Sequence, residues 1–164
     1  MTEGNGLARV SLYILRIKSM AQITVTTLVD ENDGGAGGTG ISLREAIALA
    51  NPADTITFDP SLTGQTITLT SGQQLTINTS LTIDGDLNDD GTPDITISGD
   101  ANQNDVSDAG DVRVFDITGG SVRLEGLTIT KGRSTETLGG AGIRLGNNNL
   151  NDVNASLEYD NTYR

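Results

Sequence analysis

The chain has 164 residues and a formal net charge of −12 at pH 7. It contains no Cys and no His, which excludes disulfides, thiolate zinc sites, cysteine nucleophiles and a Ser-His-Asp triad. Eleven Asp residues and not one Lys or Arg lie between Glu45 and Arg113. Such a surface repels phosphate backbones, so the sequence predicts no nucleic-acid partner.

The first 19 residues, MTEGNGLARVSLYILRIKS, contain no recognisable secretion signal. Their apolar stretch, Val10 to Leu15, is shorter than the ~7–15 residues of a signal-peptide core. No apolar run in the chain approaches the ~20 residues of a transmembrane helix. We therefore expect a poorly ordered tail over residues 1–19 and one folded part over residues 20–164, with an extra edge strand in the tail as the alternative.

The segment ITVTTLV, residues 23–29, is rich in β-branched residues and predicts a strand. An acidic, Gly-rich loop follows, and its residues 35–40 match the pattern G-x-G-x-x-G ahead of a helix. In a dinucleotide site the first Gly ends a buried strand directly, whereas here Asp30, Glu31 and Asp33 intervene and would repel a pyrophosphate. We therefore predict no nucleotide binding.

The segment ISLREAIALAN predicts the main helix of the chain, over residues 42–51. Ser42 and Glu45 have the spacing of a capping box, S-x-x-E. Apolar residues at 43, 46, 47 and 50 share one helical face, and Asn51-Pro52 ends the helix. Because a long β region follows, we expect this face to cover one end of a β core, with Ile47 against it.

After Pro52 the apolar residues alternate with polar ones, as in Ile56/Phe58 and Leu75/Ile77. The strands are short, and Gly, Asn and Asp separate them. The tripeptide Leu-Thr-Ile recurs at residues 75, 81 and 127 without one fixed period. This pattern favours an all-β solenoid with insertions of variable length, and a β-sandwich is the alternative.

The motif ISLREAI after an acidic Gly-rich loop resembles the Cys-Ser-Leu-Arg-Glu-Ala signature of bacterial CSLREA-domain proteins, with Ile41 in place of the Cys. LTINTSLTIDG and VRVFDITGGSVRLEGLTITKG resemble the strands that follow this signature in polymorphic outer-membrane proteins and related surface proteins. The resemblance implies a right-handed parallel β-helix, similar to pectate lyases, with one N-terminal capping helix. It also implies an extracellular or cell-surface location, and it suggests an N-terminal fragment, because such proteins are generally much longer.

The Asp-rich segment from Asp86 to Asp94 predicts a cation site. It places oxygen donors at loop positions 1, 3, 5, 7 and 9, which are Asp86, Asn88, Asp90, the carbonyl of Thr92, and Asp94. Hard cations such as Ca²⁺ prefer this kind of oxygen-rich loop. The bidentate Glu expected at position 12 is replaced by Ile97. Donors just downstream would have to complete the shell, and the candidates are Asp100, Asn102, Asn104, Asp108 and Asp111. A solvated, turn-rich insertion is the alternative.

Two functions remain open from the sequence. The first is a non-enzymatic secreted or surface module, an adhesive or structural stalk that meets an extracellular carbohydrate or another surface partner. The second is a fragment of a β-helix polysaccharide lyase or glycoside hydrolase, which would need clustered carboxylates. Arg113 and Arg123 near Asp116 and Glu125 form the only such cluster outside the Asp-rich loop, and on alternating strands we interpret them as ordinary outward-facing residues. The scarcity of aromatic residues favours the first function.

The C-terminal end of the sequence also carries an expectation. After Ile143 and Leu145 come an Asn-rich loop and one more predicted strand, with no candidate cap. A solenoid buries its core by stacking, so an uncapped last strand would pair with another chain. We therefore expect self-association through this end.

Overall fold

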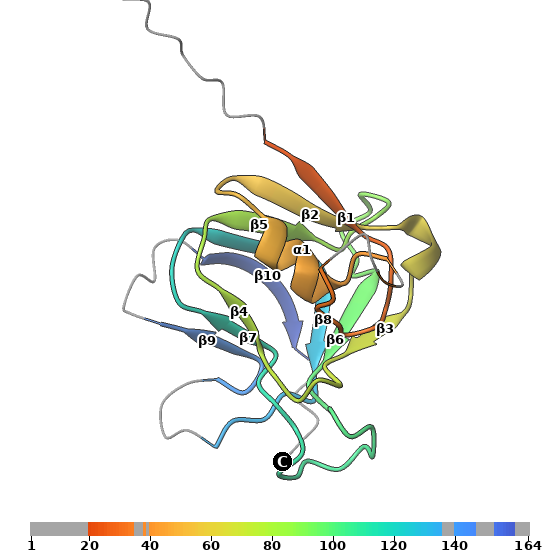
Figure 1. Ribbon diagram of the computed structural model, residues 1–164, viewed down its shortest axis with the longest axis vertical. Coiled ribbons are helices and arrows are strands. Elements are labelled where there is room, and N and C mark those ends of the chain that lie inside the picture. The colour runs from red at the N-terminus through yellow and green to blue at the C-terminus, as the bar shows by residue number, and fades with distance from the viewer. Residues whose placement is uncertain (1–19, 35–37, 39, 136–139, 147–152, 160–164) are drawn as a thin grey trace, which may run out of the picture.

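The computed structural model describes residues 20–34, 38, 40–135, 140–146 and 153–159 (Figure 1). The predicted tail over residues 1–19 lies outside this part of the chain. In chain order the elements are β1 (Gln22–Val25), α1 (Leu43–Leu49), β2 (Asp54–Phe58), the 3-10 helix η1 (Pro60–Leu62), β3 (Thr66–Thr68), β4 (Leu75–Ile77), β5 (Leu81–Asp84), β6 (Ile95–Ser98), β7 (Phe115–Ile117), β8 (Val122–Thr130), β9 (Ile143–Leu145) and β10 (Val153–Tyr159).

All strand pairs among the described residues are parallel, and they form two sheets. The larger sheet has seven strands in the order β1-β2-β5-β8-β6-β3, with β10 paired to β8 beside this path. The smaller sheet has three strands in the order β4-β7-β9. Strand β8 pairs with three strands: Val122–Glu125 pairs with β5, Leu127–Thr130 pairs with β6, and β10 pairs with both parts of β8.

The predicted fold class, an all-β right-handed parallel β-helix, is wrong. The described residues form two separate parallel sheets beside one α-helix, an α/β-like combination, and neither sheet is closed or continues as a solenoid. The reason is physical. Period-two alternation determines which side chains face the core, but it does not determine how the sheets that carry them are joined.

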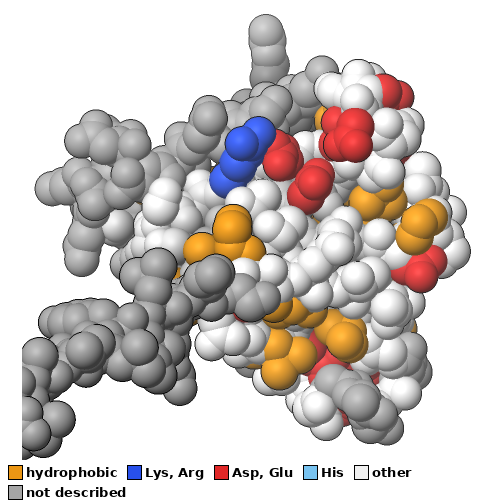
Figure 2. Space-filling view, turned by 90° about the horizontal axis from the view of Figure 1, so that it is seen from above, with side chains coloured by type: hydrophobic (Ala, Val, Ile, Leu, Met, Phe, Trp, Pro, Cys, Tyr) orange, Lys and Arg blue, Asp and Glu red, His pale blue; other side chains and the backbone are white. Residues whose placement is uncertain are grey.

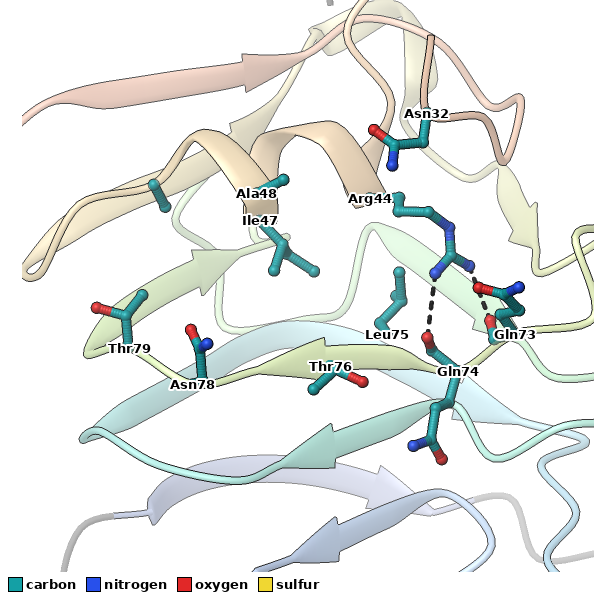
Figure 3. A pocket seen from close by; sticks show the side chains of 11 residues that line it. Asn32, Arg44, Ile47, Ala48, Gln73, Gln74, Leu75, Thr76, Asn78 and Thr79 are labelled. Carbon is teal, nitrogen blue, oxygen red and sulfur yellow. Dashed lines mark hydrogen bonds between the residues drawn. The ribbon is translucent and has the colours of Figure 1, made fainter. Parts of the chain in front are cut away.

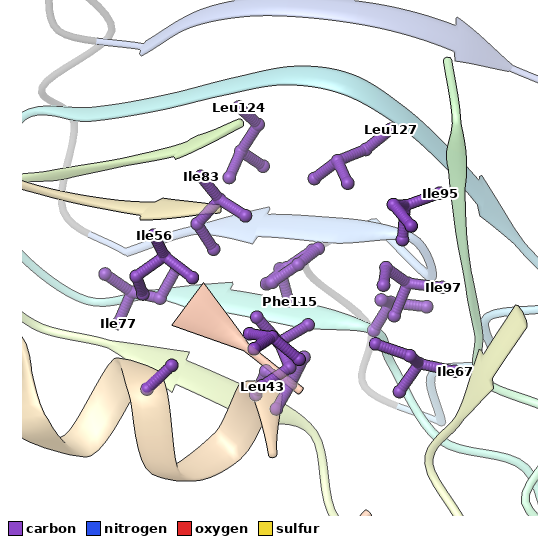
Figure 4. Packing of buried hydrophobic residues seen from close by; sticks show 14 of the residues in the cluster. Leu43, Ile56, Ile67, Ile77, Ile83, Ile95, Ile97, Phe115, Leu124 and Leu127 are labelled. Carbon is purple, nitrogen blue, oxygen red and sulfur yellow. The ribbon is translucent and has the colours of Figure 1, made fainter. Parts of the chain in front are cut away.

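The alternation itself predicts the core correctly. Alternate residues of the strands are fully buried, among them Ile56, Ile83 and Leu124, and they meet the side chains of the smaller sheet (Figure 4). The core is aliphatic apart from two aromatic side chains, Phe58 and Phe115. Each buried Leu or Ile contributes roughly 1.5–3 kcal/mol through removal of its surface from water.

The predicted helix and its capping box are confirmed. The Ser42 side chain accepts a hydrogen bond from the Glu45 N–H, and the Glu45 carboxylate accepts one from the Ser42 N–H. Leu43 and Ala46 are buried, and Ile47 is half-buried against the core. The helix contacts β1 and β4, the edge strands of the two sheets, so it covers the end at which both sheets start (Figure 1).

Gly126 lies at the bend of β8 and cannot be replaced without strain. Its φ of +62° is in the left-handed region, and a Cβ there would lie 2.0 Å from the backbone nitrogen of Asp86. This close approach places the start of the Asp-rich loop directly against β8.

Candidate functional site

The five predicted calcium ligands lie in one loop between β5 and β6. The Asp86 carboxylate accepts hydrogen bonds from the backbone N–H of Asp90, at 3.1 Å, and of Gly91, at 2.8 Å. Asp90 accepts from the N–H and hydroxyl of Thr92, and Asp94 accepts from the N–H of Leu87 at 2.8 Å. The loop is therefore a turn held by its own backbone donors, and among the described residues the carboxylates of Asp86, Asp90 and Asp94 do not form a group of three within 4.8 Å of one another.

The carboxylates around this loop differ in pKa. Hydrogen bonds from the Thr92 side chain and backbone lower the pKa of Asp90. Asp84, which ends β5 just before the loop, has its pKa raised by burial, and the negative charges of Glu125, Asp86 and Asp89 add to the effect. Asp90 is thus ionised at neutral pH, whereas burial and the nearby negative charges disfavour the ionised form of Asp84.

Except for Asp111, the downstream residues proposed to complete the shell form a second loop of their own, residues 100–108, which shares part of the first loop's hydrogen bonding. The carboxylate of Asp100 accepts from the backbone N–H of Asn104, at 3.1 Å, and of Asp105, at 3.0 Å. These are the fourth and fifth residues after Asp100, as Asp90 and Gly91 are after Asp86. Asp105 stands where the first loop has a Gly, and this difference hides the likeness in the sequence.

Three carboxylates near the start of α1 come within 4.8 Å of one another: those of Glu31, Asp33 and Glu45. The Glu45 carboxylate already accepts hydrogen bonds from the backbone N–H of Asp33, at 3.1 Å, of Gly34, at 2.9 Å, and of Ser42, at 2.9 Å. Its role is therefore to fasten the Gly-rich loop to the start of α1.

Arg44, the neighbour of Glu45, fastens a different segment to the helix. Its guanidinium donates to both carboxylate oxygens of Asp30, at 2.8 and 3.1 Å, and the Asp30 side chain is only 2% exposed. It also donates to the carbonyl oxygens of Gln73, at 2.8 Å, and Gln74, at 3.0 Å. The Arg-Glu pair of the ISLREAI motif thus joins the helix to the loops on both sides of it.

A hollow of about 440 Å³ lies between α1 and β4 (Figure 3). Ile47 and Ala48 of the helix form its apolar side. Its opposite side carries the amides and hydroxyls of Gln73, Thr76 and Asn78, with Thr79 at its end. Apart from Arg44, which is held by Asp30, the residues that line this hollow are uncharged.

A second hollow, of about 430 Å³, lies on the other side of β4 and shares Gln73, Gln74 and Thr76 with the first. Its remaining lining comes from the turn at Gly72 and from residues 112–113 and 133–135. Strand β4 therefore has a polar hollow along each side, and Thr76 at its centre borders both.

A chain of hydrogen bonds crosses the outer face of the smaller sheet next to these hollows. Arg113 donates to the Gln74 side-chain oxygen at 3.0 Å, and the Gln74 amide donates to Asp116 at 2.8 Å. Arg144 binds the same carboxylate through its Nε at 2.8 Å. The hydrogen bond from Arg144, together with the charges of Arg144 and Arg113, lowers the pKa of Asp116 against an opposing effect of burial.

These positions correct one interpretation of the sequence. Arg113 and Asp116 are not ordinary outward-facing residues, because they are only 5% and 3% exposed. Arg123 and Glu125 form a separate ion pair on β8. The sequence did not indicate Gln74 or Arg144, although one signal was available: Asp116 and Arg144 each stand at the centre of an apolar triplet, and parallel pairing aligns them.

Comparison with models of protein families, with curated proteins and with solved structures returns no match. The resemblance to CSLREA-domain proteins therefore stays a prediction from its motif. Among the described residues, no helix is long and apolar enough to cross a membrane.

Proposed function

We propose that this chain is a non-enzymatic module of a secreted or surface-associated protein, which binds an extended polyhydroxylated chain along β4. The two hollows beside Thr76 carry this proposal. Their sides present amides and hydroxyls, which both donate and accept hydrogen bonds, as sugar hydroxyls do. The extracellular location rests on the motif resemblance alone.

The state of the neighbouring carboxylates supports binding over hydrolysis. A glycosidase needs one carboxyl group with a raised pKa as acid and a second, ionised one as base or nucleophile. Beside the hollows, Asp116 is held by Arg144 and Gln74, and its pKa is lowered. Asp30 is held by Arg44 and Ser71. Both are occupied in holding the fold, which leaves a lyase or hydrolase as the second candidate.

We also propose that Ca²⁺ binds the loop from Asp86 to Asp94. The donor set consists of oxygen atoms, which a hard cation prefers. Among the described residues, no Lys or Arg side chain pairs with a carboxylate of this loop. The cation would offset this uncompensated negative charge and fix the loop against β8.

The proposed binding function is tested by a substitution that places a large side chain in the hollows. Thr76 is exposed on an edge strand, and a Thr76→Arg side chain would occupy the space on one side of β4 or the other. We expect wild-type protein to bind oligosaccharides in isothermal titration calorimetry without releasing products, and Thr76→Arg to lose at least about tenfold in affinity.

Thr66→Arg is the matched control, because Thr66 is an exposed residue of β3, an edge strand of the other sheet. It should bind as the wild type does. Release of shortened products by wild-type protein would establish the enzyme instead. Equal binding by both variants would place the site elsewhere.

A further inference from the structure

Basic side chains are few in the described part of the molecule, and most of them are paired. Figure 2 shows one face, on which acidic side chains are spread widely and basic ones are gathered in one place. Arg44, Arg123 and Arg144 each pair with a carboxylate, and Lys131 pairs with two. Arg133 differs, because its guanidinium makes no hydrogen bond or ion pair with another described residue.

Arg133 lines the second hollow beside β4, together with Arg113. Arg113 is 5% exposed, and its guanidinium donates to the Gly140 carbonyl at 2.8 Å, the Gln74 side-chain oxygen at 3.0 Å and the Ser134 hydroxyl at 2.6 Å. The hollow therefore combines a buried guanidinium, held in place by its neighbours, with the half-buried guanidinium of Arg133, which has no hydrogen-bond or ion-pair partner in the described part of the chain.

The carboxylates of Asp116 and Asp108 are both held by groups other than Arg133. Asp116 is already bound by Arg144 and Gln74. The charge of Arg133 is the smallest of the causes that lower the pKa of Asp108. The Asp108 oxygens accept hydrogen bonds from the Gly110 N–H and from the side chains of Asn102 and Asn104. Within the ranges that the structure describes, no carboxylate therefore pairs with Arg133, and its donors are available to a ligand.

We propose that the second hollow binds the carboxylate of an acidic sugar, with Arg133 as its principal contact. A guanidinium matches a carboxylate with two parallel hydrogen bonds. The hydroxyls of Thr76, Ser134 and Thr135 suit the remaining hydroxyls of the sugar ring. This inference rests on the proposed function and names its ligand class.

The net charge of −12 opposes an anionic ligand at long range. At physiological salt, however, charges further apart than about 8 Å are largely screened. Contact inside a partly enclosed hollow is screened less, so the local guanidinium groups determine binding there.

The test compares a trigalacturonate with a neutral galactotriose by calorimetry. We expect wild-type protein to bind the acidic trisaccharide at least about tenfold more tightly, and Arg133→Gln to remove this preference while it retains weak binding of the neutral one. Arg133→Lys should recover part of the preference. Arg123→Gln is the control, because Arg123 is an exposed Arg whose loss leaves the hollow intact, and it should behave as the wild type does.

The outcomes of this test separate a failure of the inference from a failure of the proposed function. If wild-type protein binds both trisaccharides equally and Arg133→Gln has no effect, the inference is overturned and the proposed function stands. If wild-type protein binds neither, both are overturned. A loss of preference in Arg123→Gln as large as in Arg133→Gln would show a general charge effect and would also overturn the inference. Unchanged thermal melts of the variants would show that each has folded.

Discussion

The loops 86–94 and 100–108 have the same internal architecture. In each, the first Asp accepts backbone hydrogen bonds from the fourth and fifth residues that follow it. In each, the fourth and sixth loop positions have positive φ, at Asp89 and Gly91 in one loop and at Gln103 and Asp105 in the other, between 57° and 81°. The first six residues of the two loops therefore have the same backbone arrangement.

The loops differ in what balances their charge. The Lys131 ammonium lies 3.6 Å from the Asp100 carboxylate and also pairs with Asp105. No Lys or Arg pairs with the first loop in the described part of the chain. Both loops therefore gather several carboxylates in a short segment. In the second loop Lys131 offsets this negative charge, whereas in the first loop a bound metal ion would have to do so.

The largest expected effect comes from removal of the internal cation. Lys131→Gln leaves Asp100, whose side chain is 6% exposed, without its ammonium partner. We expect the free energy of unfolding in urea at pH 7 to fall by about 3 kcal/mol, because a buried carboxylate loses its counter-charge. Arg123→Gln, in an ion pair whose Arg side chain is 57% exposed, should change it by no more than about 1 kcal/mol. Equal losses in the two variants would show that Lys131 does not act as an internal cation.

The next effect is stabilisation of the wild type by Ca²⁺. A cation that binds only the folded state, at about thirty times its Kd, should raise the free energy of unfolding by about 2 kcal/mol. Asp90→Ala should abolish this gain, because it removes a charged donor from the first loop. Asn104→Ala, the change at the same position of the second loop, should leave the gain intact. A calcium response that survives in Asp90→Ala would contradict the assignment.

The smallest effect concerns Asp84, beside the first loop. Its folded-state pKa is raised, so its charged form is disfavoured in the folded state at neutral pH. This penalty is absent below the unfolded-state pKa and is complete above the raised, folded-state pKa. Asp84→Asn should therefore stabilise the calcium-free protein by about 0.5 kcal/mol at pH 7, with no gain at pH 3. The same gain at both pH values in urea melts would exclude a charge effect.

The sequence predicts what depends on neighbouring residues. The helix follows from Ser42, Glu45 and an apolar face, and the structure confirms it. The buried sides of the strands follow from alternation, as at Ile56 and Phe58. The joining of these strands into two separate sheets does not follow, because it depends on pairings between distant segments, and the predicted fold class was therefore wrong.

The residues of the candidate site likewise include some that the sequence predicts and some that it does not. The loop from Asp86 to Asp94 is contiguous, so its pattern is visible in the sequence, and calcium binding there stays a prediction. The link between Gln74 and Asp116 joins residues 42 positions apart, and that between Asp116 and Arg144 joins residues 28 apart. Arg133 differs from the other described Arg and Lys residues only through contacts between distant segments, which the sequence does not show.

The adjacent Arg44 and Glu45 have a consequence for local unfolding. Glu45 holds residues 33–34 through its carboxylate, and Arg44 holds Asp30 and the 73–74 segment through its guanidinium. If the helix detaches from the two sheets, all of these hydrogen bonds are lost together. The helix and both loops therefore form one cooperative unit, so this end of the molecule is either sealed or fully open to water.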